Sequence, residues 1–435
     1  MADVHAFRAF RYDLARVGNL SDVVAPPYDV IDTGLQQALY DRSPHNVIRL
    51  ILNKETAADS DHNNRYTRAA QTLRDWQQDG ILAQDSARSL YVYHQDFEVE
   101  GRRYTRKGFM ARVRLEPFGS GRIYPHEETM SGPKADRLKL FRATAMNLSQ
   151  IFGLFPDEEG AVAAALDAAV GRALPIQAVD HLGVVSKVWP VTNQQTISTI
   201  SGLLGAKPVF IADGHHRYET ALKYLEEKRQ AGEAADPDHP ANFVLMMLVS
   251  MHDPGLVILP THRLISGVGD LRADRLKALL NPYFQVDTVG AGPEAAALTW
   301  EMIESDGAQQ LLGFGTVGDG IWQTARFRAV EQMAQAAPEH SEAWRKLAVA
   351  VLQRIVLERV LSQGGIEPKC QYVHLLREIN EAVAARQCQV AALVPAATMD
   401  HVAQIAGNLE KMPPKSTYFY PKLLSGLVFH SLKTN

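Results

Sequence analysis

The sequence predicts an α+β fold in which mixed sheets pack against helices. Segments with apolar residues at helical spacing alternate with short apolar runs along all 435 residues. Glycine and proline interrupt these segments often and briefly, as in compact domains. Two strand-like segments also flank Glu100-Gly101, where glycine permits the tight turn of a hairpin. No repeat of solenoid length is visible, so a repeat array is not expected.

The length suggests two or three domains, and we expect three regions. An N-terminal α/β region with the hairpin spans residues 1–120, a phosphate-binding core spans 121–265, and a C-terminal α+β region at 266–435 packs back on the core. Helices are expected at residues 66–76, 134–148, 160–174, 215–229, 271–280, 293–303 and 343–361. Strands are expected at residues 47–52, 90–99, 104–115, 151–155, 184–191, 207–212, 243–251, 309–314, 321–327, 390–394 and 418–420. Residues 331–341 are polar and rich in alanine, and we expect a loop or a frayed helix there.

Composition restricts the partners and the compartment. The chain carries 45 basic and 49 acidic residues, a net charge of −4 that gives no electrostatic basis for bulk nucleic-acid binding. Its two cysteines, Cys370 and Cys388, cannot form a disulfide framework. The N-terminus has no signal-like apolar stretch, and the longest apolar run, 243–251, is about half a membrane span. We therefore expect a cytoplasmic protein that binds neither nucleic acid nor membrane.

The most informative segment is a strand-like run that ends at Asp213-Gly214 and leads directly into a helix. His215, His216 and Arg217 fall in the first helical turn, where the backbone N–H groups attract anions. Positive side chains are unfavourable at this end unless an anion is present. The pattern thus predicts a bound phosphate or carboxylate. The alternative is an Asp N-cap followed by a solvated basic turn. A metal site is less favoured because adjacent histidines cannot both face one ion.

A second segment places an imidazole, carboxylates, a hydroxyl and basic side chains close together in the sequence. Glu127 could act as a general base, with His126 and Thr129 beside it in the sequence. Lys134 and Arg137 could bind phosphate. The alternative is a turn and a helix start that carry solvated charges.

Two further segments offer weaker candidates for a substrate pocket. In residues 412–422, polar groups including Lys415, Ser416 and Thr417 precede alternating aromatics. The pattern is explained more simply by an ordinary edge strand closed by prolines. His262 follows a buried strand, and such a residue is more often structural.

Several of these segments, in this order, identify the chain as a member of the family called domain of unknown function 1015. They are residues 25–30, 93–112, 125–138, 212–221, 260–263 and 412–422, so the resemblance covers nearly the whole chain.

The segment Asp213-Gly214-His215-His216-Arg217 is also similar to the phosphate-binding segment of the ParB and sulfiredoxin superfamily, which includes free-serine kinases. The resemblance implies a ParB/sulfiredoxin-like strand–turn–helix within residues 121–265. It also implies that the His-His-Arg turn holds nucleotide phosphates, that Asp213 orients substrate or metal, and that an upstream glutamate, for which Glu127 is the candidate, is the base. The N- and C-terminal regions have no counterpart in those compact enzymes.

The resemblance thus implies a phosphotransferase for a small hydroxyl metabolite, first of all free L-serine, which would become O-phosphoserine. The donor would be ATP, ADP or pyrophosphate, with Mg²⁺ accompanying it. Two alternatives stay open: a ParB-like nucleotide-binding regulatory protein, and a metal-dependent phosphohydrolase. The expected partners are the substrate and the donor, and the expected oligomer, if any, is a homodimer. The pocket candidates are His126, Thr129, Tyr218, His262, Lys415, Ser416 and Thr417.

Overall fold

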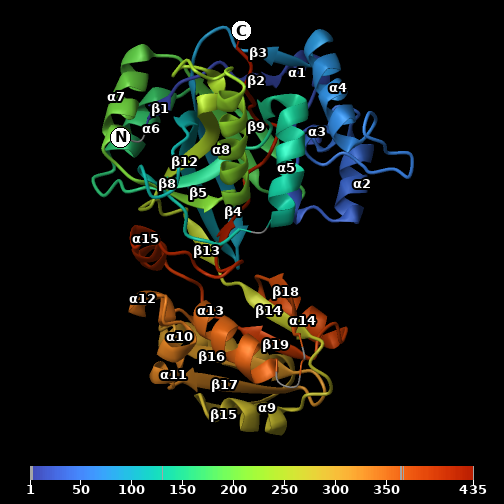
Figure 1. Ribbon diagram of the computed structural model, residues 1–435, viewed down its shortest axis with the longest axis vertical. Coiled ribbons are helices and arrows are strands. Elements are labelled where there is room, and N and C mark those ends of the chain that lie inside the picture. The colour runs from blue at the N-terminus through green and yellow to red at the C-terminus, as the bar shows by residue number, and fades with distance from the viewer. Residues whose placement is uncertain (1–2, 130, 363–364, 366, 435) are drawn as a thin grey trace. The chain divides into compact units, whose positions relative to one another are not determined.

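The computed structural model describes residues 3–129, 131–362, 365 and 367–434 (Figure 1). The chain divides into two compact units. Unit 1 comprises Met1–Pro125, Thr129–Val257 and Pro421–Asn435, and unit 2 comprises His126–Glu128 and Ile258–Tyr420. The boundaries predicted at residues 120 and 265 stay predictions, because units defined by contacts need not fold independently.

Unit 1 is built on a mostly antiparallel sheet. Within the described residues it has nine strands in the order β6-β11-β8-β12-β5-β4-β10-β9, with β1 paired to β5. Two neighbouring pairs, β12–β8 and β11–β6, are parallel. The strands are β1 (Val4–His5), β4 (Leu90–Val99), β5 (Arg102–Arg114), β6 (Ile123–Tyr124), β8 (Ile151–Phe155), β9 (Ile176–Val179), β10 (Val185–Val191), β11 (Val209–Asp213) and β12 (Phe243–Ser250). Two small ladders join β2 (Phe10–Tyr12) to β3 (Leu82–Gln84) and β7 (Met146–Asn147) to β21 (His430–Ser431).

Helices cover this sheet, and α5 and α8 lie side by side in front of it in Figure 1. The helices are α1 (Leu14–Val17), α2 (Thr33–Arg42), α3 (Ile48–Ile51), α4 (Arg65–Gln78), α5 (Ser131–Thr144), α6 (Ala161–Val170), α7 (Gln194–Gly205) and α8 (His215–Gln230), with 3₁₀ turns η1 (Leu20–Asp22), η2 (Tyr28–Val30) and η3 (Pro240–Asn242).

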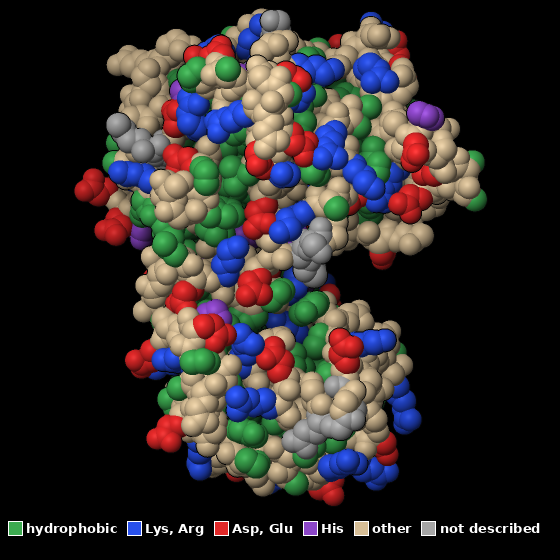
Figure 2. Space-filling view, viewed as in Figure 1, with side chains coloured by type: hydrophobic (Ala, Val, Ile, Leu, Met, Phe, Trp, Pro, Cys, Tyr) green, Lys and Arg blue, Asp and Glu red, His purple; other side chains and the backbone are tan. Residues whose placement is uncertain are grey.

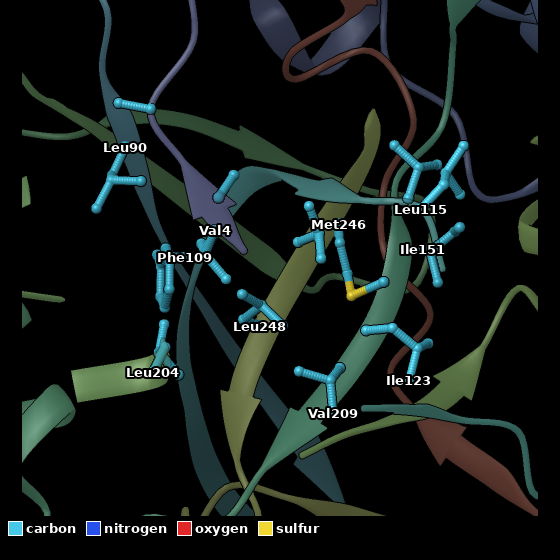
Figure 3. Packing of buried hydrophobic residues seen from close by; sticks show 14 of the residues in the cluster. Val4, Leu90, Phe109, Leu115, Ile123, Ile151, Leu204, Val209, Met246 and Leu248 are labelled. Atoms are coloured by element: carbon cyan, nitrogen blue, oxygen red, sulfur yellow. The ribbon is translucent and has the colours of Figure 1, made fainter. Parts of the chain in front are cut away.

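The core of unit 1 lies between one face of the sheet and helices α6, α7 and α8 (Figure 3). Phe109 and Met246 come from central strands, and Leu204 comes from α7; none of them is exposed. Each fully buried side chain of this kind stabilises the fold by roughly 1.5–3 kcal/mol. This packing fixes the strand β11 and the helix α8 that follows it.

Unit 2 has its own antiparallel sheet, with six strands among the described residues in the order β15-β17-β16-β19-β14-β18. A separate ladder pairs β13 with β20. The strands are β13 (Val257–Leu259), β14 (His262–Ser266), β15 (Phe284–Ala291), β16 (Leu311–Thr316), β17 (Ile321–Phe327), β18 (Lys369–Val373), β19 (Val390–Leu393) and β20 (Tyr418–Tyr420). The helices are α9 (Ala273–Leu280), α10 (Gly292–Asp306), α11 (Val330–Ala336), α12 (Glu342–Arg345), α13 (Ala348–Val351), the π-helix η4 (Leu352–Leu361), α14 (Leu376–Ala384) and α15 (Met399–Gly407). Helices α10 and α14 pack on this sheet around Trp322 and Ile379.

The α+β prediction is confirmed, and so are the hairpin of β4 and β5 and most of the longer elements. The strand predicted at residues 47–52 is wrong, because the segment forms the short helix α3. The side chain of Asn46 accepts a hydrogen bond from the Ile48 N–H (2.9 Å) and donates to the carbonyls of Asp22 and Val24. A buried apolar run does not reveal this cap.

The single helix predicted at residues 343–361 is also wrong in detail. The segment divides into α12, α13 and η4, with a break at Lys346-Leu347. The side chain of Ser341 caps α12 by accepting from the Trp344 N–H (3.2 Å). Residues 330–336 form the helix α11. It begins one residue before the segment 331–341, for which a loop or a frayed helix is expected from the sequence.

The surface carries both signs of charge. Figure 2 shows Lys and Arg side chains interspersed with Asp and Glu over the face in view. None of the described helices has the length and the apolar character needed to cross a membrane.

Candidate functional site

The predicted strand–turn–helix is present as β11, Gly214 and α8. Gly214 adopts a left-handed conformation (φ 92°, ψ 25°), which glycine reaches without the strain that a Cβ atom would cause. A Cβ atom here would also lie 3.0 Å from Nε and Nη2 of Arg217. The turn thus requires glycine for two reasons, and it sets Asp213 beside the start of the helix.

Asp213 lies between two cations. Its Oδ2 accepts a hydrogen bond from Nη2 of Arg217 at 2.7 Å, and its Oδ1 accepts one from Nζ of Lys422 at 3.1 Å. Arg217 also donates through Nη1 to the carbonyl of Gln150. Positive side chains in the first turn of α8 are unfavourable unless an anion is near, and the carboxylate of Asp213 is such an anion within the chain. We call Asp213, Arg217, Lys422 and the first turn of α8 the Asp213 group.

The start of α8 keeps its capacity to attract an anion. The residue that precedes the helix, Gly214, has no side chain with which to cap this end, and the helix runs for 16 residues. The N–H of Tyr218 is the first to bond to the carbonyl of Gly214, so the N–H groups of His215, His216 and Arg217 precede the helical ladder. Such an end stabilises phosphate oxygens.

The backbone that carries Lys422 is held by buried polar side chains. The Pro421 carbonyl accepts from Arg106 (2.6 Å), and the Lys422 carbonyl accepts from Gln95 (3.2 Å). Gln150 donates to the Leu424 carbonyl (3.0 Å). Burial lowers the pKa of Arg106 to about 10, so it remains charged at neutral pH. These contacts fix the position from which Lys422 reaches Asp213.

Lys134 and Thr129 meet one turn further along α8. Nζ of Lys134 lies 2.8 Å from Oε2 of Glu219 and 3.2 Å from Oγ1 of Thr129, and Thr129 donates to the same carboxylate at 2.8 Å. The predicted phosphate ligand Lys134 is therefore engaged by a carboxylate, which an incoming anion would have to replace or share.

Arg137 is buried and anchors the turn at residues 26–28. Its guanidinium lies 3.9 Å from the centroid of the Tyr28 ring and donates to the Ile51 carbonyl at 2.8 Å. Its neighbour Asp136 also accepts from Tyr66 at 2.7 Å. Burial opposes the charge of Asp136, but Arg137 and the other donors outweigh it and lower its pKa. This arrangement gives the predicted phosphate-binding role of Arg137 no support, and the role stays a prediction.

Unit 2 brings together two segments that are far apart in the sequence. Nε2 of His126 lies 2.8 Å from Oγ1 of Thr417, and the N–H of Lys415 donates to Oε1 of Glu127 at 2.6 Å. Thr417 is also 3.5 Å from Oε2 of Glu127, while Ser416 donates to the Pro413 carbonyl at 2.6 Å. We call His126, Glu127, Lys415, Ser416 and Thr417 the Glu127 group.

Tyr218 and His262 lie inside the cores of their units. The Tyr218 hydroxyl donates to the Glu116 carbonyl (2.9 Å) and accepts from its N–H (3.0 Å). Nδ1 of His262 accepts from the Val394 N–H (3.2 Å), and burial lowers the pKa of its ring to about 3. Their predicted pocket roles stay predictions, and this placement gives them no support.

Three residues of the arrangement were not predicted as site residues: Lys422, Gln150 and Glu219. Glu219 was within reach, because it lies one helical turn after His215 in the segment that the sequence singled out. Lys422 ends the segment 412–422 that the sequence singled out, but only the tertiary fold brings it and Gln150 to the start of α8.

Magnesium fits poorly at Asp213 in this arrangement. Mg²⁺ requires carboxylate or phosphate oxygens in near-octahedral geometry. Both oxygens of Asp213 already accept hydrogen bonds from cations, which compete with a divalent ion. Within the described ranges, no three His, Cys, Asp or Glu residues are grouped so that they could hold a metal ion.

Comparison with known proteins places the chain in a family. The model of the family described as "Protein of unknown function (DUF1015)" matches residues 4–350. No curated protein matches. Among solved structures, a free serine kinase in complex with AMP matches with 12% identity and a TM-score of 0.34, over 68% of this chain and 83% of that one.

Two other solved structures match at a similar level. A conserved hypothetical protein from Pyrococcus furiosus has 10% identity and a TM-score of 0.32, over 68% of this chain and 87% of its own. SbnI from Staphylococcus aureus, truncated at its C-terminus, has 9% identity and a TM-score of 0.34, over 73% and 86%. At such identities and scores, these matches carry no argument about the activity of this chain.

Proposed function

The chain belongs to the DUF1015 family, whose description assigns no activity, and we propose that it is a phosphotransferase acting on a small hydroxyl metabolite. The acceptor expected first is free L-serine. The observation that carries the proposal is the turn at Gly214, where the start of α8 lies next to Asp213 with Arg217 and Lys422 on its carboxylate.

The Asp213 group supplies what donor phosphates need. Phosphoryl transfer depends on positioning and on offsetting the charge of the phosphates. The first-turn N–H groups of α8 can donate to phosphate oxygens, and Lys422 and Arg217 supply positive charge beside them. Asp213 holds both cations before the ligand arrives, so the cost of ordering them is met in the folded protein.

Glu127 is the proposed base. It would accept the proton of the acceptor hydroxyl as that oxygen forms a bond to the terminal phosphorus and the bond from phosphorus to the leaving phosphate breaks. The hydrogen bond from the Lys415 N–H orients this carboxylate. Lys415 adopts a left-handed φ of 59°, a strained conformation for a residue other than glycine that places its N–H at Glu127.

The donor is proposed to be ATP, ADP or pyrophosphate. Mg²⁺ bound to the donor would neutralise part of its charge and keep most of its ligands as water or phosphate oxygens. Because Asp213 fits poorly as a ligand, no step is assigned to the metal on this chain.

The first experiment measures nucleotide binding. Lys422→Gln should raise the Kd for ATP or ADP by about tenfold to a hundredfold, because one hydrogen bond to a charged group is lost. The Kd is measured by isothermal titration calorimetry. Lys422→Arg should retain most of the affinity. Lys369→Gln changes an exposed lysine of unit 2 and is the matched control. Equal affinities for Lys422→Gln and Lys369→Gln would remove the Asp213 group from the proposal.

The second experiment separates transfer from binding. Glu127→Gln should lower the rate of O-phosphoserine formation by about 10²–10⁴-fold and leave nucleotide affinity unchanged, because the base acts on the acceptor. Glu128→Gln is the control, since Glu128 is the exposed neighbour. Full activity in Glu127→Gln would show that the base is another residue. Nucleotide binding without transfer in the wild-type protein would favour the regulatory alternative.

A further inference from the structure

A cavity of about 270 Å³ lies in unit 1 among residues that the proposed function does not use. Its lining includes Arg8, Arg88, Arg112 and Lys433, with Asp238 as the only carboxylate among the described lining residues. Four cations against one carboxylate leave an excess of three positive charges, in a chain whose net charge is −4. Such a local excess attracts anions.

Arg112 of β5 lines this cavity, and its buried Nε has no hydrogen-bond partner among the described residues. Only 8% of the residue is exposed. Arg88 and Arg112 both line the cavity, and burial and then the charge of Arg88 lower the pKa of Arg112. A buried, unpartnered N–H group beside a second cation is costly unless a ligand accepts from it.

An aromatic contact holds the guanidinium of Arg112 in place. Its guanidinium carbon lies 4.2 Å from the centroid of the Phe243 ring, so one face of the group is covered by an aromatic side chain. The edges that remain are the ones with which arginine binds phosphate and carboxylate in a bidentate manner.

His430 adds a second buried polar atom to the lining. The residue is 4% exposed, and its Nε2 also has no hydrogen-bond partner among the described residues. Burial, followed by the charge of Arg112, lowers the pKa of the ring to about 3, so it is neutral at pH 7. A neutral imidazole can donate to an oxyanion or accept from its protonated form.

We propose that this cavity is a second anion site, which binds a small oxyanion carrying a phosphoryl group between Arg88 and Arg112. A phosphoryl dianion fits the excess of positive charge better than a single carboxylate does, and it offers three acceptor oxygens to donors from several directions. The volume is slightly below that of pockets for drug-sized ligands, which favours a small ligand. The site is independent of the Asp213 group.

The test is calorimetric titration of the full-length protein with inorganic phosphate, and in separate arms with AMP and with succinate. Arg88→Gln changes an exposed arginine and should fold normally; it should raise the Kd for phosphate by at least about tenfold. Arg112→Gln should do the same. Arg172→Gln, an exposed arginine elsewhere in unit 1, should change this Kd by less than about twofold. Lys422→Gln weakens phosphate binding at the Asp213 group and should leave intact the binding that Arg88→Gln weakens.

The arms distinguish the sources of the phosphoryl group. The comparison is made on the part of the binding that Arg88→Gln weakens. Tighter binding of phosphate than of AMP there indicates a site for free phosphate, and the reverse indicates a phosphorylated metabolite; both support the proposal. The proposal is overturned if succinate binds as tightly as phosphate, if Arg88→Gln behaves like Arg172→Gln, or if Lys422→Gln alone abolishes phosphate binding.

Discussion

Replacing Asp213 by asparagine tests whether the Asp213 group is a rigid part of the fold. The substitution keeps the size of the side chain and removes its charge. It leaves Arg217, whose side chain is 9% exposed, and Lys422, at 13%, near each other without the carboxylate that holds them. Removing one partner of a buried ion pair costs about 3–5 kcal/mol. Because Asp213 itself is 20% exposed, water relieves part of that cost, and we expect about 3 kcal/mol.

The matched control is Glu227→Gln. Glu227 accepts two hydrogen bonds from Arg142, whose side chain is 55% exposed. Surface pairs of this kind contribute about 0–1 kcal/mol, and salt screens them. The free energy of unfolding is measured by urea titration followed by far-ultraviolet circular dichroism, at 0.05 and about 0.5 M salt.

The expected result is a loss of about 3 kcal/mol for Asp213→Asn that changes little with salt, against less than about 1 kcal/mol for Glu227→Gln. If the two variants lose the same small amount, Arg217 and Lys422 are solvated cations. The reasoning that Asp213 orders them for a ligand would then fail.

Three further predictions concern backbone, burial and charge. Gly214→Ala and Gly232→Ala both place a Cβ atom at positive φ, and each should lower the free energy of unfolding by about 1–2 kcal/mol. Only Gly214→Ala should weaken nucleotide binding, because its Cβ contacts Arg217, whereas a Cβ at Gly232 has no atom within 4 Å. Equal nucleotide affinities of the two variants would contradict this. Burial lowers the pKa of His262 to about 3, so the unfolded state takes up a proton that the folded state does not between about pH 6.5 and 3, and stability falls as the pH is lowered through that range. His262→Asn should reduce the slope of unfolding free energy against pH by about 1.4 kcal/mol per unit, and an unchanged slope would exclude a buried neutral histidine. The pKa of Asp136 is lowered in the folded protein, so its contribution to stability is complete above 3.8, the pKa in the unfolded chain, and is lost as the pH falls below that value. Asp136→Asn should therefore flatten the acid side of the plot of unfolding free energy against pH. A plot that stays parallel to that of the wild type would refute the assignment.

Local features of the fold could be predicted from the sequence because short segments encode them. Glu100 and Gly101 both have positive φ, as a two-residue hairpin turn requires, and the strands on either side pair directly across them. The turn at Gly214 is local in the same way, since an apolar strand, a glycine and a helical pattern follow one another within residues 209–221.

Contacts across long stretches of chain could not be predicted in this way. Lys422 and Asp213 are 209 residues apart, and His126 and Thr417 are 291 apart. Which charged groups meet is decided by how the strands pack, and side-chain type alone does not report it. The sequence therefore places Asp213 and Arg217 in one local turn, but it does not indicate that Lys422 contacts Asp213 or that Lys134 contacts Glu219.

The same limit explains the errors in secondary structure. The segment at residues 348–361 is buried on several sides, so its apolar pattern does not reveal the change from the α-helix α13 to the π-helix η4. Burial makes a continuous apolar pattern compatible with several helical forms, and the neighbouring elements decide among them.

The most direct test of the proposed function is ³¹P nuclear magnetic resonance of the purified protein with Mg²⁺, a pool of amino acids, and ATP, ADP or pyrophosphate in separate tubes. We predict a new phosphomonoester signal that appears only when serine is present and only with one class of donor. Release of inorganic phosphate without an ester would indicate a phosphohydrolase. The absence of any new signal, with nucleotide binding intact, would contradict the assignment as a phosphotransferase.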